Sequence, residues 1–472
     1  VIIYGAGNSG VVTKRTLDRD AGMKYRVLAM IDEDPGKIGK KIEDVPIYSP
    51  DKLKELLDTY QVAHVILSIP NIKPEKKQEI VDLCLANKTR VLSVPPASKW
   101  INGELSFKQI KKINIENLLE RDIIKMDEKK LHAELRGKVV LITGAAGSIG
   151  SEIVRQLLHI ELAYLVLVDN AETPLHHLTL EIDEFGDIID YTTVLGDIRN
   201  KTQMELVFNT FQPEVVYHAA AYKHVPLIES NPGEAVLTNI VGTQIIADLS
   251  LQYNVRRFIM ISTDKAVYPT SIMGASKRIA EMYTQSMNAQ NTTRFITTRF
   301  GNVLGSNGSV IPLFEKQIRK GGPLTITHPL VTRFFMTIPE ACQLVLEAST
   351  MGQGGEIYMF DMGKSVKITD LAKKMIQLSG LEPGKDIQIV YTGLRPGEKL
   401  YEELLDDTEN AIPTHHPQIM IAKVTPCDFN TVTKNIHKLT RLARKNRDKE
   451  IVREMKRIVP EFDSLNPVYM QK

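Results

Sequence analysis

Two short apolar runs in this chain each lead directly into a glycine-rich loop and then into a segment with helical periodicity. The runs and their loops are residues 1–4 with Gly5, Gly7 and Gly10, and residues 138–143 with Gly144, Gly147 and Gly150. A strand, a glycine loop and a helix in this order open a parallel sheet that is covered by helices on both faces. Two such openings in a chain of 472 residues therefore predict an α/β fold with two doubly wound parallel-sheet domains.

The predicted elements divide the chain into three parts. The strands expected before the second glycine loop are residues 26–31, 64–69 and 90–94, with a helix at 77–87. Residues 95–136 contain only short amphipathic pieces and separate the two units. We therefore predict an N-terminal domain at residues 1–100, a connector at 101–137 and a second domain at 138–472.

The second domain changes its pattern part of the way along. Its main strands are predicted at residues 139–143, 164–168, 190–195, 215–218, 257–262 and 294–300. After Gly301 the predicted strands become shorter (324–327 and 387–391) and the helices lie at 339–349 and 368–378. This change predicts a smaller C-terminal lobe beside the main sheet.

Composition argues against several classes of function. The 59 Lys and Arg nearly balance the 57 Asp and Glu, and a net charge of +2 provides little field to gather nucleic acid. The cysteines Cys84, Cys342 and Cys427 form no metal-ligand spacing, so we expect reduced thiols and no metal site. No apolar run reaches the ~18 residues that cross a bilayer. The chain opens inside an apolar strand without Met, so we expect a missing upstream segment.

The second glycine loop has the setting of a dinucleotide site. Glycine permits the tight turn and the close approach of the pyrophosphate, which the helix N-terminus then binds. The next strand leads to Asp169, whose carboxylate would bind the adenosine ribose and repel a 2′-phosphate. The loop therefore predicts NAD as the cofactor. The residues expected to bind it are Gly144, Gly147, Ser148, Ile149, Gly150, Asp169, Asn170, Asp197, Ile198, Ala219, Ala220 and Ala221.

The first glycine loop is similar in outline. Gly5, Gly7 and Gly10 have GxGxxG spacing, and Asp32 stands where a ribose ligand would stand. A duplicated fold can also keep such glycines only to make the turn. The sequence leaves open whether this loop binds a nucleotide.

An acid and an amine stand side by side after the predicted strand 257–262. Thr263, Asp264 and Lys265 follow one another there, and Lys277 lies on the next helix. Ligands bind at the carboxyl ends of strands in open α/β sheets. Burial shifts lysine toward its neutral form and aspartic acid toward its protonated form. We therefore expect Lys265 to act as a base and Asp264 as an acid.

Six motifs between residue 138 and about 420 are distinctive: TGAAGSIG, HAAAYKHVPLIE, STDKAVYPTSIMGASK, RFGNVLGSNGSVIPLF, TRFFMTIPEA and GLRPGEKLYEEL. With them, this part of the chain resembles the extended short-chain dehydrogenase/reductase superfamily, in particular its nucleotide-sugar 4,6-dehydratases. The superfamily normally has tyrosine four residues before Lys277, where this chain has Met273. Methionine cannot transfer a proton, so the base for the sugar 4-hydroxyl stays open among Thr263, a water and Tyr268.

One branch of these dehydratases, whose members have longer chains, is similar in having methionine at this position. The whole chain is similar to its members, the membrane-anchored UDP-N-acetylglucosamine 4,6-dehydratases of bacterial glycan and capsule pathways, in which a CoA-binding-like Rossmann domain precedes the catalytic domain. The resemblance implies NAD-dependent oxidation at C4, loss of water across C5 and C6, and hydride return to C6 with retention at C5. It also implies a homo-oligomer at the cytoplasmic face of the bacterial inner membrane, held there by a segment upstream of this chain.

The same resemblance assigns further roles to single residues. Lys277 is expected to hold the nicotinamide ribose and to place positive charge near the 4-hydroxyl. The residues expected to contact the UDP-sugar in the C-terminal lobe and nearby loops are Lys223, Asn302, Arg333, Arg395 and Glu398.

Three other functions compete with this interpretation. An inverting dehydratase would also epimerise C5, but that branch usually keeps the tyrosine that Met273 replaces. A nucleotide-sugar 4-epimerase relies on the same tyrosine and lacks the acid–base pair for elimination. A non-catalytic nucleotide-binding protein would have no need of Asp264, Lys265 and Lys277 together.

Overall fold

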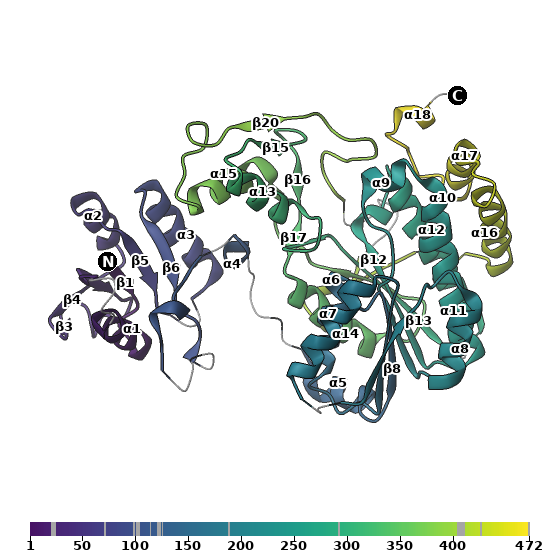
Figure 1. Cartoon of the computed structure of the whole chain (residues 1–472), viewed down its shortest axis with the longest axis horizontal. Coiled ribbons are helices and arrows are strands. Elements are labelled where there is room, and N and C mark those ends of the chain that lie inside the picture. Colours follow the sequence, from purple (N-terminus) through teal and green to yellow (C-terminus); the bar gives the residue numbers. More distant parts are fainter. Residues whose placement is uncertain are drawn as a thin grey trace. The chain divides into compact units, whose positions relative to one another are not determined.

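The computed structural model describes residues 1–19, 25–69, 72–97, 100, 104–113, 115–119, 124, 126–186, 189–290, 293–403, 411–424 and 427–470 (Figure 1). The chain forms two compact units. The first comprises residues 1–122, 313–325 and 369–390, and the second comprises 123–312, 326–368 and 391–472. Parts of the predicted C-terminal lobe thus belong to the first unit, where Lys374 pairs with Asp82 at 2.6 Å. The predicted domain bounds stay a proposal.

The first unit is built on a seven-stranded sheet in the order β3-β4-β2-β1-β5-β6-β7. Its strands are β1 (Ile2–Tyr4), β2 (Ala29–Ile31), β3 (Lys41–Ile42), β4 (Val45–Tyr48), β5 (His64–Leu67), β6 (Arg90–Ser93) and β7 (Lys111–Lys112). The inner strands are parallel, and β3 and β7 pair antiparallel at the two edges. Its helices include α1 (Asn8–Arg19), α2 (Lys52–Thr59), α3 (Pro74–Ala86), α4 (Glu116–Leu119) and α15 (Ile368–Leu378).

The β3–β4 hairpin of this sheet was not predicted. Its turn is made by Glu43 and Asp44, both with positive φ, a conformation that hairpin turns usually fill with Asn or Gly. Because neither residue is glycine or asparagine, the turn signal is missing from the sequence.

The second unit contains a nine-stranded sheet in the order β10-β9-β8-β11-β12-β13-β18-β22-β21. These strands are β8 (Val139–Thr143), β9 (Tyr164–Asp169), β10 (Tyr191–Leu195), β11 (Val215–His218), β12 (Arg257–Thr263), β13 (Arg294–Phe300), β18 (Ile357–Phe360), β21 (Ala411–Pro413) and β22 (Ile419–Ala422). The strands from β10 to β18 are parallel, whereas β22 and β21 are antiparallel. The order reverses between β8 and β11, which is the place where doubly wound sheets bind ligands.

Helices cover both faces of this sheet (Figure 1). Along β8 the buried side chains alternate, with Val140 and Ile142 in one apolar core and Leu141 in the other. The first core is shared with α5 (Glu128–Leu135), α6 (Ser148–Leu157), α7 (Glu172–Glu184) and α14 (Ile338–Met351). The second is shared with α8 (Lys201–Phe211), α11 (Thr243–Gln252), α12 (Ile272–Ser286), α16 (Phe429–Ala443) and α17 (Asp448–Ile458). The predicted fold class, two Rossmann-like parallel-sheet domains, is confirmed.

Two short strand pairs of the second unit position the loops beyond the carboxyl end of its main sheet. β14 (Asn302–Val303) pairs with β17 (Phe335–Met336), and β16 (Thr332–Arg333) pairs with β19 (Val366–Lys367). A third pair joins β15 (Leu324–Ile326) to β20 (Ile389–Tyr391). The first two pairs bring Asn302 and Arg333 to one region although they are distant in sequence. In the part of the chain that the structure describes, no helix is long and apolar enough to cross a membrane.

Candidate active site

The glycine loop of the second unit has no room for side chains at two positions. Gly144 has a φ of 70°, and a Cβ there would lie 2.6 Å from the backbone nitrogen of Ala220. A Cβ on Gly150 would lie 2.1 Å from the carbonyl oxygen of Gly144. The loop therefore packs directly against the end of β11 and the first turn of α6. This is the close backbone packing expected of a dinucleotide loop.

Asp169 lies at the carboxyl end of β9, beside this loop. Its Oδ2 accepts a hydrogen bond from the Ala146 nitrogen at 2.9 Å, and its Oδ1 accepts one from the Ala171 nitrogen at 2.9 Å. The carboxylate is therefore held at the loop without a cationic partner among the described residues. The neighbouring Asn170 is exposed. This placement suits the predicted contact with an adenosine ribose.

The other residues predicted to bind NAD occupy varied surroundings. Asp197 is bound by the guanidinium of Arg199, with 2.6 Å between Oδ2 and the nearest nitrogen. Ile198 is buried in the apolar core below it. Ala219, Ala220 and Ala221 follow β11, and Ser148 and Ile149 begin α6 after Gly147. Their binding of cofactor stays a prediction.

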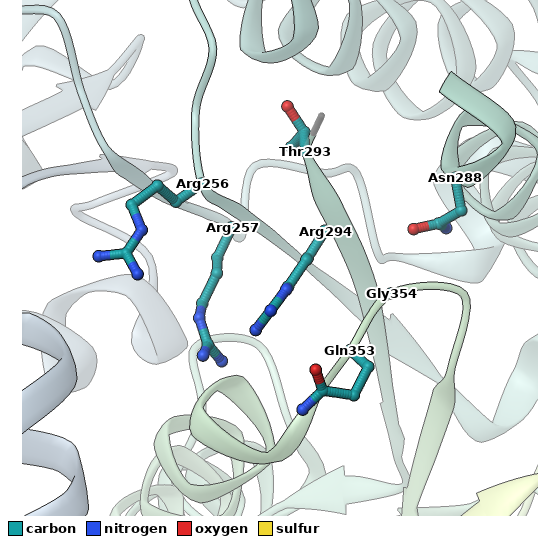
Figure 2. A pocket seen from close by; sticks show the side chains of 7 residues that line it. All are labelled: Arg256, Arg257, Asn288, Thr293, Arg294, Gln353 and Gly354. Atoms are coloured by element: carbon teal, nitrogen blue, oxygen red, sulfur yellow. The ribbon is translucent and has the colours of Figure 1, made fainter. Parts of the chain in front are cut away.

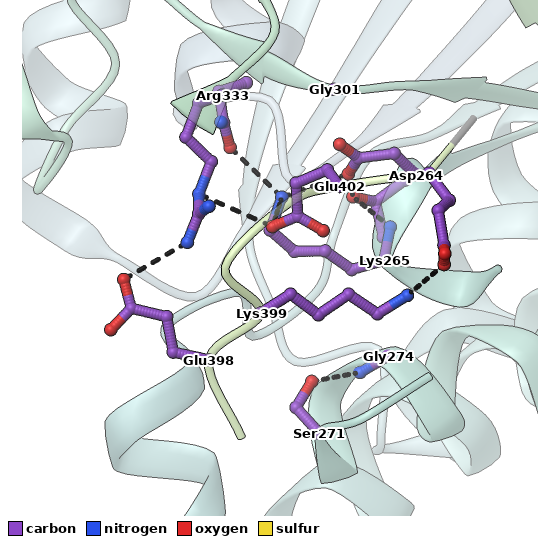
Figure 3. Close-up of polar contacts among 12 residues, drawn as sticks. Asp264, Lys265, Ser271, Gly274, Gly301, Arg333, Glu398, Lys399 and Glu402 are labelled. Atoms are coloured by element: carbon purple, nitrogen blue, oxygen red, sulfur yellow. Dashed lines mark hydrogen bonds and ion pairs between the residues drawn. The ribbon is translucent and has the colours of Figure 1, made fainter. Parts of the chain in front are cut away.

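The acid and the amine predicted from the sequence contact each other at the end of β12 (Figure 3). Lys265 Nζ lies 3.0 Å from Asp264 Oδ1, and the Thr263 hydroxyl donates to the same oxygen at 2.8 Å. Lys265 also donates to Asn302 Oδ1 at 3.1 Å. Asp264 is only 2% exposed. Asp264 Oδ1 thus accepts hydrogen bonds from both the Thr263 hydroxyl and the Lys265 ammonium group.

A second carboxylate, which the sequence analysis missed, completes this cluster. Glu402 Oε1 lies 3.4 Å from Lys265 Nζ and 3.5 Å from Arg333 Nε. The remaining oxygens, Asp264 Oδ2 and Glu402 Oε2, are buried and have no hydrogen-bond partner among the described residues. Glu402 stands in a glutamate-rich string, LYEEL, and nothing in that string distinguishes it from Glu403. Only the folded loop brings it to Lys265.

The neutral form expected for Lys265 is wrong for the resting site. Burial alone would lower the pKa of Lys265, but the negative charges of Asp264 and Glu402 outweigh burial and raise the pKa above its usual value. Asp264 makes the larger contribution and Glu402 adds to it, so the resting lysine is an ammonium ion.

The pKa of Lys277 is lowered, whereas that of Lys265 is raised. Lys277 Nζ donates to the carbonyl oxygen of Ile261 at 2.7 Å. Burial lowers the pKa of Lys277 to about 8. Met273, one helical turn earlier on α12, is also buried, and its thioether cannot take the place of a tyrosine as an acid or a base.

The five residues predicted to contact substrate line one cavity of about 250 Å³. Lys265 and Glu402 line the same cavity. The guanidinium of Arg333 lies 3.1 Å from Glu398 Oε1, and Arg395 is exposed. The predicted substrate residues in the lining are Lys223, Asn302, Arg333, Arg395 and Glu398. Their joint position supports a shared ligand, while the ligand itself stays a prediction.

His218 has structural surroundings. Buried His218 contacts the hydroxyls of Thr143 and Thr243 at 2.7 and 2.9 Å, and burial lowers its pKa to about 3. Among the residues with described positions, no group of three or more His, Cys, Asp and Glu could hold a metal ion.

The fold and the site together define a class. The doubly wound parallel sheet of the second unit is the fold of short-chain dehydrogenase/reductase epimerases and dehydratases. The structure of the DesIV double mutant, a dTDP-glucose 4,6-dehydratase from Streptomyces venezuelae with NAD and DAU bound, has the same fold. It aligns with a TM-score of 0.51 and 22% identity, covering 63% of this chain and 96% of DesIV.

Residues 140–424 match the family described as polysaccharide biosynthesis protein, and the chain belongs to that family. It is similar to the capsular polysaccharide biosynthesis protein CapD of Staphylococcus aureus, with 44% identity over 90% of this chain and 70% of CapD. The X-ray structure of Pen from Bacillus thuringiensis aligns with a TM-score of 0.57 and 35% identity, covering 61% of this chain and 88% of Pen. Residues 1–94 match the CoA binding domain family.

Proposed function

We propose that this protein is an NAD-dependent 4,6-dehydratase that converts UDP-N-acetylglucosamine to its 4-keto-6-deoxy sugar with retention at C5. The observation that carries the proposal is the single cavity in which Lys265, held between two carboxylates, meets the residues expected to bind a UDP-sugar. An epimerase has no use for such an acid–base pair, because no water is eliminated.

The chain's own loop supports NAD as the resident cofactor. Gly144 and Gly150 leave a cradle that a Cβ would fill, and Asp169 presents a carboxylate where the adenosine ribose would bind. Bound NAD would accept a hydride from C4 of the sugar and return it to C6. Lys277, with its lowered pKa, would hold the nicotinamide ribose.

The first proton to move is that of the sugar 4-hydroxyl. Thr263 donates its own proton to Asp264, so it can relay the hydroxyl proton to that carboxylate. Once Asp264 is neutral, Lys265 has lost one of the two negative charges that raise its pKa. It then gives a proton to Glu402, whose Oε1 is 3.4 Å away. The cluster now holds a neutral amine, Lys265, and two carboxylic acids, Asp264 and Glu402.

Elimination uses the neutral amine of Lys265 and the protonated carboxyl group of Asp264. The Lys265 amine removes the C5 proton, and Asp264 donates its proton to the C6 hydroxyl, which leaves as water. Lys265 then returns its proton to C5 as the hydride returns to C6, and Glu402 returns its proton to Lys265. The cycle ends with the resting ammonium and its two carboxylates, so atoms and charges balance.

Incubation with UDP-N-acetylglucosamine in deuterated water, followed by NMR of the product, tests the proposal. We expect a C6 methyl group, deuterium at C5 and a coupling pattern that reports retention. An inverted C5 would assign the inverting reaction, and a product that differs only at C4 would assign an epimerase. Absence of any product would contradict an enzymatic function on this substrate. Membrane attachment, inner-membrane location and a homo-oligomer stay predictions.

A further inference from the structure

Three arginines gather at the amino-end edge of the main sheet of the second unit, away from the site described above. Arg257 begins β12 and Arg294 begins β13, and the two residues are direct register partners in the sheet. Arg256 precedes Arg257 in the chain. Together with Asn288, Thr293, Gln353 and Gly354, they line a cavity of about 410 Å³.

The charges in this cavity are only partly compensated. Arg257 is 5% exposed, donates to the carbonyl oxygen of Ser349 and lies 3.1 Å from Glu134. No ion-pair partner of Arg256 or Arg294 is found among the described residues. Burial lowers the pKa of Arg257, and the positive charges of Arg294 and Arg256 lower it further against the opposing effect of Glu134.

Three of the lining side chains approach one another. Figure 2 shows the guanidinium ends of Arg257 and Arg294 next to one another, with the amide of Gln353 approaching them. Planar guanidinium groups match the oxygen geometry of phosphate and bind it through paired hydrogen bonds. The lining contains no aromatic or large apolar side chain on which a nucleobase could pack.

We propose that this cavity binds a small phosphorylated anion without a nucleobase, such as inorganic diphosphate or a sugar phosphate. The site is separate from the active site, because the seven residues of β12 span roughly 20 Å between the sheet's two ends. A ligand there would contact the first residues of the two strands whose carboxyl ends lead to Asp264 and Asn302. The inference does not depend on the proposed reaction.

Isothermal titration of the whole chain with pyrophosphate tests this site. Saturation with NAD and UDP beforehand keeps the probe out of the other phosphate sites. We expect one equivalent to bind, and Arg294→Gln and Arg256→Gln each to weaken binding roughly tenfold, the loss typical of one charge-assisted hydrogen bond. Both side chains are exposed, so the variants should fold. The control Arg441→Gln removes the same charge from an exposed position on α16 and should change affinity less than twofold.

Titration with glucose 1-phosphate distinguishes the two ligand sources. Tighter binding of pyrophosphate assigns the site to inorganic diphosphate, and tighter binding of glucose 1-phosphate assigns it to sugar phosphates. The proposal is overturned if neither anion binds, or if Arg294→Gln binds as tightly as Arg441→Gln.

Discussion

The two glycine loops of this chain, one in each unit, are close structural counterparts. A Cβ on Gly10 would lie 1.9 Å from the carbonyl oxygen of Gly5, and a Cβ on Gly150 would lie 2.1 Å from that of Gly144. Asp32 accepts a hydrogen bond from the Ala6 nitrogen at 2.7 Å, as Asp169 does from its own loop. In each unit the helix is thus packed against the loop with no space for a side chain.

The units differ in what surrounds the loop. Asp32 is paired with Lys37 at 3.2 Å, whereas Asp169 has no cationic partner in the described part of the chain. After β5 of the first unit stands Ser68, whose hydroxyl bonds the carbonyls of Tyr4 and Gly5. After β12 of the second unit stands a buried cluster built on Asp264. The comparison teaches that the same loop makes the turn in both units, whereas the side chains at other strand ends differ between them.

Replacing one aspartate by asparagine in each unit should produce the largest difference in dehydration rate. Asp264→Asn should lower the dehydration rate by ~10²–10⁴-fold, because an amide cannot transfer the proton, while NAD still binds. Asp32→Asn should leave the rate within about twofold, since no step runs through the first unit. Product formation from UDP-N-acetylglucosamine measures both. Equal losses in the two variants, or normal turnover of Asp264→Asn, would contradict the division of roles.

Replacing Glu402, the second carboxylate of the cluster, should have the next largest effect on the rate. Glu402→Gln should lower the rate by ~10²-fold, because Lys265 loses the group that accepts its proton. Glu402→Asp, which keeps a carboxylate, should retain more activity than the glutamine variant. The matched control is Glu403→Gln, since Glu403 pairs with Lys399 and its side chain is 54% exposed. Similar rates for Glu402→Gln and Glu403→Gln would remove Glu402 from the mechanism.

Glycine substitutions test how alike the loops are. Gly150→Ala and Gly10→Ala should each lower the free energy of unfolding by about 1–3 kcal/mol, because the new Cβ overlaps a backbone oxygen. Gly7→Ala should change it by less than about 0.5 kcal/mol, since nothing lies within 4 Å of a Cβ there. Urea unfolding provides the measurement. The proposed similarity fails if Gly10→Ala is as harmless as Gly7→Ala.

The pH dependence of the rate should identify Lys277 as a charged group of the second unit. Its pKa of about 8 means that the ammonium is present below that pH and is lost as pH rises through it. The rate should therefore fall about tenfold per pH unit above this point. Lys277→Arg should move this decline out of the accessible range, because arginine stays charged. A decline that persists unchanged in Lys277→Arg would point to another group.

The smallest effect is expected at the ion pair of the first loop. Lys37→Met should lower the free energy of unfolding by less than about 1 kcal/mol, since the lysine is 37% exposed and such pairs contribute little. The difference from the unchanged protein should shrink further in high salt. A larger decrease in the free energy of unfolding would show that the first loop needs the Lys37–Asp32 ion pair for its stability, whereas Asp169 is held without such a pair among the described residues.

Much of the fold was predictable because its signals are local. The apolar runs that became β8, β12 and β13 appear in the sequence with nearly their observed bounds, as do the glycine loops between strand and helix. β18 was missed, although its four residues are all buried as are those of β11, which was predicted. Its place beside β13 depends on packing between distant segments.

The reactive triplet and the loop glycines were determined by the sequence itself, since neighbours in a chain stay neighbours and only glycine fits where backbone meets backbone. The tertiary structure alone decided that Glu402 lies against Lys265, where it adds to the effect of Asp264 in raising the pKa of the lysine. It also decided that Arg257 and Arg294 share one cavity. The physical reason is that electrostatic energy depends on distance in space, and those distances exist only after the chain has folded.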